Sequence, residues 1–421
     1  MEGKQILILN ITAYALLLLH LIRKKKSRLS IFVSAIWCAS AVFSLVFYGL
    51  NGANWEFRTY TNLTLQPFVF IFVCILLYII PLTRIEDRST ILVEGNYNLL
   101  TILSWFIVII SIAPFFANLA YAINHMGESL SAFADNREID VEIFDGTLAL
   151  LNKYSKYART FSPILLFYFL QRPRPNIFLL IGLFCAFLNP SLGNLNMGSR
   201  FLFAADFLYL IAIYLIFSNS LEDKIRSKIR FFGSIVLSFF IVIFLSISFF
   251  RFSALNSSTA TLDATTSFSL YAGEGMLNFS SNMWDIPKRT DGSNTLTFVD
   301  YIIGDNPSSV RDADRVSEKA GIPLYIFYTV VGDFYIDFGP YVTFAIFLGI
   351  CILLCYLLRK QKFQYSFYDF VWICLLIRII VIGFTYFPYM NLSMELVYVP
   401  ILNMVLSFFD KASGEHSHNT L

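Results

Sequence analysis

Three acidic side chains stand where acid–base chemistry could take place. Asp333 and Asp337 lie one helical turn apart in the apolar stretch 321–341, and Glu274 stands between two glycines in "YAGEGMLNF" (271–279). A carboxylate close to an attacking hydroxyl can take its proton as a general base. We therefore predict Glu274 and Asp337 as catalytic residues and Asp333 as a substrate-binding residue. The alternative for Asp337 is structural, as a helix cap or as the partner of an arginine.

Two arginines have positions that suit the binding of an anion. Arg378 lies several residues inside an apolar segment, where a cation costs about 2.5–3.5 kcal/mol on insertion scales and needs a partner. Arg200 closes "NMGSR" at an expected helix start, where free N–H groups and the helix dipole attract phosphate. We predict both as substrate-binding residues. Two alternatives remain open: Arg378 pairs with Asp206 or Glu395, and Arg200 extends to lipid headgroups.

Further substrate-binding candidates lie between residues 251 and 339. Arg251 opens this stretch, Tyr271 begins "YAGEGMLNF", and Arg311 and Arg315 share one face of an expected helix in "SSVRDADRVSEKAG". Aromatic rings stack on sugar rings, and arginines bind anionic oxygens in pairs. We predict a sugar-binding surface here. The alternative for the two neighbouring arginines is a solvated surface helix.

The cysteines and histidines indicate neither a metal site nor a disulfide. All six cysteines lie in apolar segments, and Cys351 and Cys355 have no histidine or carboxylate near them in sequence. His125 is the only histidine that falls in an expected outer loop, where it is a lesser candidate for a base. We therefore expect no metal and no cofactor.

The elements that must position these residues belong to a membrane protein. The chain has 421 residues, of which 57% are hydrophobic and 14% charged, whereas an average soluble domain has about 25% charged residues. Apolar segments of about 18 residues or more recur, and each can cross roughly 30 Å of hydrocarbon as a helix. The sequence predicts an all-α, polytopic membrane protein with about eleven spans. They lie near 5–22, 29–50, 65–82, 99–121, 157–171, 177–192, 201–218, 231–250, 340–358, 367–387 and 392–409.

Basic residues orient the predicted bundle. Lys and Arg cluster in alternate short loops, and the positive-inside rule places such loops in the cytoplasm. The clusters are "RKKKSR" (23–28), "TRIEDRS" (83–89), "RPRPN" (172–176), "EDKIRSKIR" (222–230) and "RKQK" (359–362). The N-terminus is then predicted outside and the C-terminus inside. These short loops carry no phosphate-binding motif, and a net charge of +2 gives no reason to expect nucleic acid as a partner.

The same orientation places two large loops outside. The predicted organisation is eight spans in 1–250 with an outer loop near 122–156, a large outer loop over 251–339, and three spans with a cytoplasmic tail over 340–421. The Gly339-Pro340 step indicates a break before the ninth span, because proline is favoured in the first turn of a helix. We expect residues 322–338 to lie at the membrane surface or to be partly re-entrant, lining a cavity.

Three short stretches carry a resemblance to a known family. A many-span bundle with "GSR" at an outer helix start, "YAGEGMLNF" in a large outer loop and "YTVVGDFYIDFG" (328–339) before the next span resembles the Wzy-type repeat-unit polymerases of O-antigen and capsule synthesis. The resemblance extends over most of the chain as an architecture and over these stretches at residue level. It implies a GT-C-like bundle with a large periplasmic loop, in a bacterial inner membrane.

The resemblance also implies a reaction and its partners. The donor is a glycan on undecaprenyl pyrophosphate, and the acceptor is the non-reducing end of one lipid-linked repeat unit, both at the periplasmic face. An acceptor hydroxyl attacks the anomeric carbon, the lipid pyrophosphate leaves, and arginines stabilise the leaving anion. A chain-length regulator is a further partner that the resemblance leaves open. Two alternative functions also remain open: an O-antigen ligase, and a flippase or transporter of lipid-linked oligosaccharides.

Overall fold

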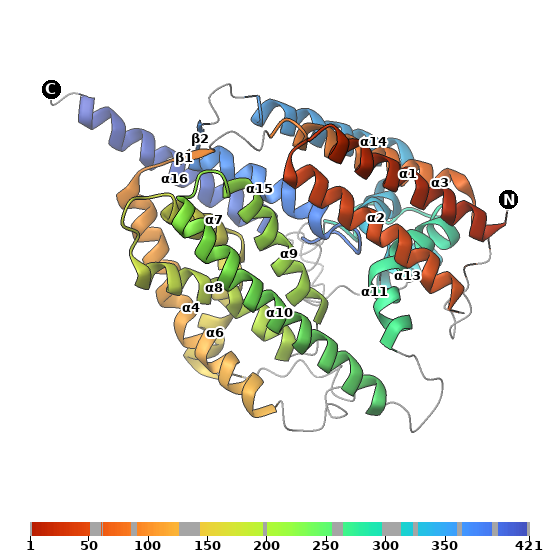
Figure 1. Cartoon of the computed structure of the whole chain (residues 1–421), viewed down its shortest axis with the longest axis horizontal. Coiled ribbons are helices and arrows are strands. Elements are labelled where there is room, and N and C mark those ends of the chain that lie inside the picture. Colours follow the sequence, from red (N-terminus) through yellow and green to blue (C-terminus); the bar gives the residue numbers. More distant parts are fainter. Residues whose placement is uncertain are drawn as a thin grey trace. The chain divides into compact units, whose positions relative to one another are not determined.

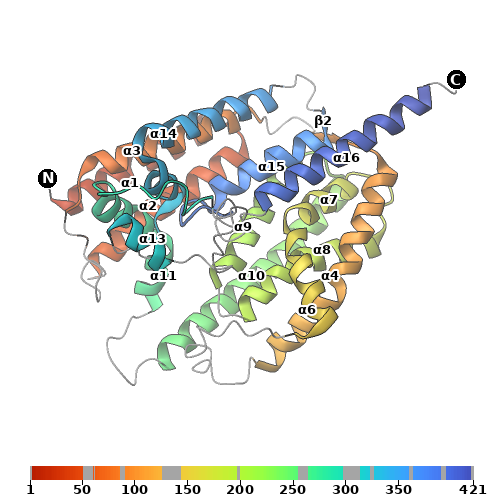
Figure 2. The same cartoon turned by 180° about the vertical axis from the view of Figure 1, so that it is seen from behind.

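The residues that the structure describes form helices almost throughout, together with two short strands (Figures 1 and 2). The computed structural model describes residues 2–50, 60, 62–85, 91–125, 144–196, 200–254, 264–296, 313–322, 327–359, 364–389 and 395–418. These residues belong to two compact units. Unit 1 comprises residues 1–88, 265–361 and 375–400, and unit 2 comprises residues 89–264, 362–374 and 401–421.

Unit 1 is built on three neighbouring helices, α1, α2 and α3, with α14 packed against α3. Its elements are α1 (Gly3–Arg23), α2 (Arg28–Gly49), α3 (Leu65–Leu82), α11 (Ala264–Asn278), the π-helical turn η4 (Phe279–Met283), α13 (Ala313–Ala320) and α14 (Thr329–Leu357). Two more helices have several residues in each unit: α15 (Phe367–Ile382) and α16 (Glu395–His418).

Unit 2 is centred on α8, which packs against α4, α7 and α9. Its helices are α4 (Tyr97–His125), α6 (Gly146–Ser155), the 3-10 turn η2 (Lys156–Arg159), α7 (Phe161–Leu170), α8 (Ile177–Asn196), α9 (Arg200–Phe217) and α10 (Asp223–Ala254). Its strands are β1 (Leu92–Glu94) and β2 (Gln364–Ser366), which pair in parallel.

The observed helices agree with an all-α membrane protein. Among the described residues, α1, α2, α3, α4 and α14 are long and apolar enough to cross a membrane, and α7, α8 and α9 contain shorter apolar helices. Every predicted span overlaps one of the observed helices. The helical class is therefore confirmed, whereas the number of spans and the likeness to GT-C bundles stay predictions.

An apolar stripe along α4 shows how such a helix meets lipid. Ile102, Phe106, Ile109, Phe116 and Ile123 are each at least 60% exposed, and their spacing of three, four or seven residues places them on one helix face. A water-soluble surface rarely exposes so continuous an apolar row. This face is therefore suited to contact acyl chains.

Several segments predicted to share the cytoplasmic side come together in unit 2. β1 follows the basic cluster at 83–89, and its partner β2 follows the cluster at 359–362. The carbonyl of Ile91 accepts hydrogen bonds from Gln171 Nε2 (2.6 Å) and from Ser220 Oγ (2.5 Å). Described segments next to four basic clusters thus meet within unit 2, which agrees with a common side of the membrane. Which side that is stays a prediction.

The described residues of the segment predicted as one large outer loop, 251–339, are largely helical. It contains the end of α10, then α11, η4, α13 and the first part of α14. Residues 329–337, expected at the membrane surface or as a re-entrant segment, form a buried helix in unit 1. The mixed polar and aromatic composition of this stretch hides its helical periodicity in the sequence.

The predicted break at Gly339-Pro340 is confirmed. Gly339 adopts φ 74° and ψ −177°, a conformation that glycine reaches without steric cost, and it divides α14 into two helical parts. Pro340 has no N–H to donate to the carbonyl of Ile336, four residues earlier. The N–H of Thr290 donates to that carbonyl instead, at 3.2 Å. The break therefore provides an attachment point for the segment that precedes α13.

Candidate functional site

Asp337 lies in the last turn before the break in α14 and is almost fully buried. Its carboxylate accepts hydrogen bonds from the backbone N–H groups of Asn294 (3.1 Å) and Thr295 (2.7 Å). It also accepts from the hydroxyls of Thr290 and Thr295. These bonds hold residues 290–295 against α14. They favour a structural role for Asp337. The partner of its carboxylate is the segment 290–295, and not an arginine or the start of a helix.

Asp333 lies one turn earlier in α14 and is fully buried. It accepts hydrogen bonds from Asn294 Nδ2 (2.8 Å) and from the backbone N–H of Phe387 (2.5 Å). Asn294 therefore contacts both carboxylates, one through its side chain and one through its backbone. The predicted pair of acidic residues is brought together, and Asp333 connects α14 to the segment that follows α15.

That segment, residues 383–389, is the common neighbour of several predicted site residues, and we call it the 383–389 turn. The first N–H groups of α14 donate to it, Thr329 to the carbonyl of Thr385 (2.9 Å) and Val330 to that of Gly383 (2.7 Å). A helix start needs acceptors of this kind, because its first N–H groups have no partner inside the helix. The 383–389 turn therefore fixes where α14 begins, and with it the position of Asp333.

Glu274 lies in α11 and is fully buried. The hydroxyl of Tyr60 donates a hydrogen bond to its Oε1 at 2.8 Å. Tyr60 belongs to the connection between α2 and α3, so this bond joins two distant parts of unit 1. A buried carboxylate with a hydroxyl partner can hold or release a proton, which is the chemistry expected of a general base.

The two glycines beside Glu274 explain how it comes to be so deeply buried. A Cβ at Gly273 would lie 2.3 Å from the backbone nitrogen of Ser44, and a Cβ at Gly275 would lie 3.0 Å from the carbonyl oxygen of Phe384. Only glycine allows such approaches, to α2 on one side and to the 383–389 turn on the other. The "GEG" pattern thus lets α11 pass close to two other backbones on either side of Glu274.

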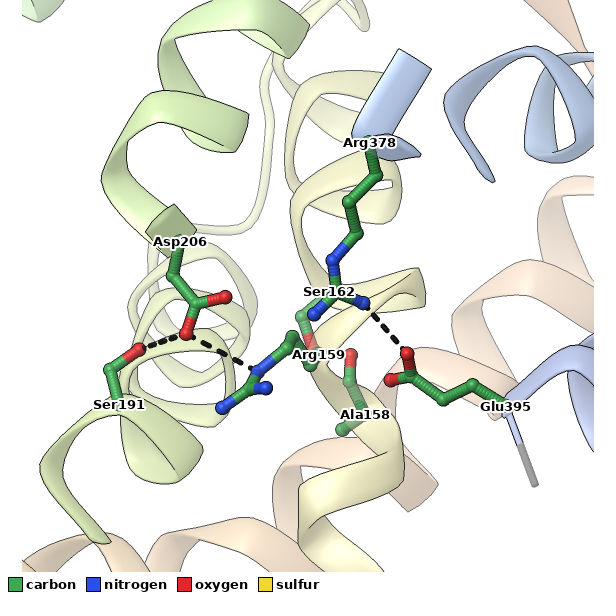
Figure 3. A network of polar contacts seen from close by, with 7 residues as sticks. All are labelled: Ala158, Arg159, Ser162, Ser191, Asp206, Arg378 and Glu395. Carbon is green, nitrogen blue, oxygen red and sulfur yellow. Dashed lines mark hydrogen bonds and ion pairs between the residues drawn. The ribbon is translucent and has the colours of Figure 1, made fainter. Parts of the chain in front are cut away.

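Arg378, in α15, forms a buried ion pair. Its Nη1 donates to Glu395 Oε2 at 2.7 Å, and the two side chains are 2% and 0% exposed (Figure 3). The guanidinium carbon also lies 5.3 Å from the ring centre of Tyr389, in the 383–389 turn. Glu395 is therefore the carboxylate that partners Arg378, one of the two alternatives drawn from the sequence.

Asp206, the other carboxylate considered for Arg378, has an ionic partner in unit 2. Arg159 Nε lies 3.2 Å from Asp206 Oδ2, and Ser191 Oγ donates to the same oxygen at 2.6 Å (Figure 3). Sequence reasoning missed Arg159. Like Arg378, Arg159 lies inside a predicted span (157–171). It stands near the end of that span, where an arginine can reach the interface without a partner.

For the other predicted residues, the structure describes a side-chain contact only at Tyr271. The ring of Tyr271 packs against that of Phe327, with centroids 5.1 Å apart. Three arginines lie on helices, but their side chains are outside the described part of the structure: Arg200 at the start of α9, Arg251 near the end of α10 and Arg315 in α13. Arg311 lies outside the described residues altogether.

The candidate site is therefore the part of unit 1 around the 383–389 turn. Its backbone approaches Glu274 through Gly275, it donates to Asp333, and it carries Tyr389 against Arg378. A buried carboxylate and a buried, oriented guanidinium provide a proton acceptor and a cation in a low-dielectric setting. No family model, no curated protein and no solved structure matches the chain.

Proposed function

We propose that the chain is a Wzy-type glycosyltransferase that polymerises lipid-linked oligosaccharide repeat units at the periplasmic face of a bacterial inner membrane. The observation that carries the proposal is the buried Arg378–Glu395 pair inside an apolar helix bundle. An ionisable residue within a membrane segment is by default a functional-site candidate, because its insertion is costly. The resemblance of three sequence stretches to this family supports the same function.

In the proposed reaction, Arg378 interacts with the diphosphate of the donor. Glu395 keeps the guanidinium oriented until the lipid diphosphate arrives, and the developing negative charge of the leaving group then strengthens its attraction to Arg378. Fixed charges of this kind act strongly in a dry site, because they need no reorganisation during the reaction. Arg200, at the start of α9 in unit 2, stays a predicted substrate-binding residue.

Glu274 is the proposed general base. The acceptor hydroxyl forms the new bond to the anomeric carbon of the donor while the bond from that carbon to the diphosphate oxygen breaks. The hydroxyl proton passes to Glu274, and the bonding electrons leave with the lipid diphosphate. Tyr60 orients the carboxylate through its hydrogen bond to Oε1. No nucleotide takes part, since the donor already carries its leaving group.

Deleting the gene for this protein from its host tests the proposal, because the length of the surface glycan reports on polymerisation. We expect glycan that is one repeat unit long but still attached, because single units are delivered and ligated but not joined. A gel that resolves glycan length provides the measurement. Free polymer without attachment would indicate a ligase, and single units retained inside the cell would indicate a flippase; either result contradicts a polymerase.

A further inference from the structure

The buried arginine of unit 2 occupies a well-defined place. Arg159 ends the 3-10 turn η2, directly before α7, and is 3% exposed. Its Nε faces Asp206 Oδ2 at 3.2 Å, and Ser191 donates to the same carboxylate oxygen (Figure 3). One edge of the guanidinium is therefore neutralised, and Asp206 is itself held in place from α8.

The helices around Arg159 are joined by polar contacts that fix its backbone. Asn189 in α8 donates to the hydroxyl of Ser155 at 2.6 Å, and Asn118 in α4 donates to Asn189 at 2.9 Å and to Asn152 at 3.1 Å. Ser155 and Asn152 belong to α6, which leads straight into η2. The turn that carries Arg159 is thus held by three helices, and preorganised supports of this kind are what a binding residue needs.

The outer edge of the Arg159 guanidinium remains available to a ligand. Within the part of the chain that the structure describes, no hydrogen bond is seen at its terminal amino groups Nη1 and Nη2, and its buried Nε has an ionic contact with Asp206 but no hydrogen-bond partner. A guanidinium has five N–H donors and no acceptor. Buried donors without acceptors are destabilising, so a ligand that supplies oxygen atoms to this edge would bind favourably.

The chemistry of that edge favours phosphate over a neutral sugar. Two parallel N–H groups in a planar array match two anionic oxygens of a phosphate, and such charge-assisted pairs are stronger than bonds to hydroxyls. A hydroxyl would also bring a hydrogen that needs an acceptor, which a guanidinium lacks. An anionic oxygen pair is therefore the best complement.

We propose that Arg159 binds the diphosphate of a second lipid-linked substrate. This inference rests on the proposed function, because polymerisation uses two lipid diphosphates, one on the donor and one on the acceptor. Each unit contains an ion pair between largely buried side chains: Arg378–Glu395 in unit 1 and Arg159–Asp206 in unit 2. One diphosphate is assigned to each arginine.

The test is the number of diphosphates bound by the purified full-length protein. With farnesyl diphosphate as probe and the protein in phosphatidylcholine nanodiscs, we expect two sites per chain in the wild type and one in Arg159→Lys. Lysine keeps the charge that faces Asp206 but loses the paired N–H groups, so affinity at this site should fall about tenfold or more. Arg172→Lys, at the opposite end of α7, is the matched control and should keep both sites.

A second variant separates binding from folding. Asp206→Asn removes the counter-charge, so farnesyl diphosphate should raise the melting temperature more in this variant than in the wild type, whereas Arg159→Lys should show a smaller rise. Two sites retained in Arg159→Lys, or one site in the wild type, would overturn the proposal. The same holds if Asp206→Asn shows no larger rise.

Two further arms identify the source of the phosphate and separate this inference from the proposed function. Inorganic pyrophosphate should compete, whereas added phosphatidylglycerol should not; displacement by that lipid would make Arg159 a headgroup site and overturn its assignment to substrate. Polymer formation is assayed on the same samples. If the wild type binds two diphosphates but forms no polymer, the proposed polymerase activity is contradicted and the Arg159 site is not. If polymer forms but Arg159→Lys still binds two diphosphates, the Arg159 site is contradicted and the polymerase activity is not.

Discussion

Replacing Arg378 by alanine is expected to abolish polymer formation, and removing Glu395 as well is not expected to restore it. The buried guanidinium is proposed to stabilise the leaving diphosphate, and the loss of one such preorganised donor typically lowers a rate by about 100-fold or more. Alanine also leaves Glu395 as an unpaired buried charge, which destabilises the fold. The double change Arg378→Ala with Glu395→Ala removes that second effect and isolates the first.

Lysine at position 378 gives the more discriminating result. Arg378→Lys keeps a positive charge opposite Glu395 but loses the planar array of donors. We expect normal abundance in the membrane and reduced polymer, measured by immunoblot and by glycan gel on the same cells. Arg359→Lys, an exposed arginine beyond the end of α14, is the control and should leave both unchanged. Restored activity in the double alanine variant would instead assign Arg378 a purely structural role.

The second large effect distinguishes two carboxylates that look alike in the sequence. Glu274→Gln should lower polymer formation by about 100-fold or more while the protein stays at normal abundance. Glutamine keeps the volume of the side chain and an oxygen for the hydroxyl of Tyr60, but it cannot take a proton. Asp337→Asn should instead lower abundance and melting temperature, with activity falling in proportion.

The reason for the difference is the number of donors around Asp337. Its two oxygens accept from two backbone N–H groups and two hydroxyls, and an asparagine amide would turn its own N–H groups toward some of them. Lost bonds and unfilled buried donors together cost on the order of 3 kcal/mol. Asp285→Asn, an exposed change in the preceding segment, should be neutral. A stable but inactive Asp337→Asn, or a fully active Glu274→Gln, would contradict these roles.

Much of the fold could be predicted because its signals are local. Apolar runs of helical length predicted where helices occur, and the Gly339-Pro340 step predicted the break in α14. The insertion cost of Arg378 required a partner, and Glu395 was one of the two carboxylates considered. A buried charge requires a partner, but its insertion cost does not distinguish between two carboxylates that are far away in sequence.

The remaining features depend on contacts between distant segments. Nothing near Asp337 in the sequence indicates that residues 290–295 supply its donors, since that pairing forms only when the segment folds over the break in α14. Arg159 was missed because a charge near the end of a span can extend to the interface without a partner. Its carboxylate partner, Asp206, comes from another helix, a pairing that requires the packed unit.

Reconstitution tests the proposed polymerase most directly. The purified protein is placed in liposomes with lipid-linked repeat units as the sole added substrate and with no nucleotide, and the glycan products are separated by length. We predict a ladder that grows by one repeat unit per step and releases one lipid diphosphate for each unit added, with no ladder from Glu274→Gln. Repeat units that remain single, while the protein stays folded and binds them, would contradict the proposal that this chain joins them.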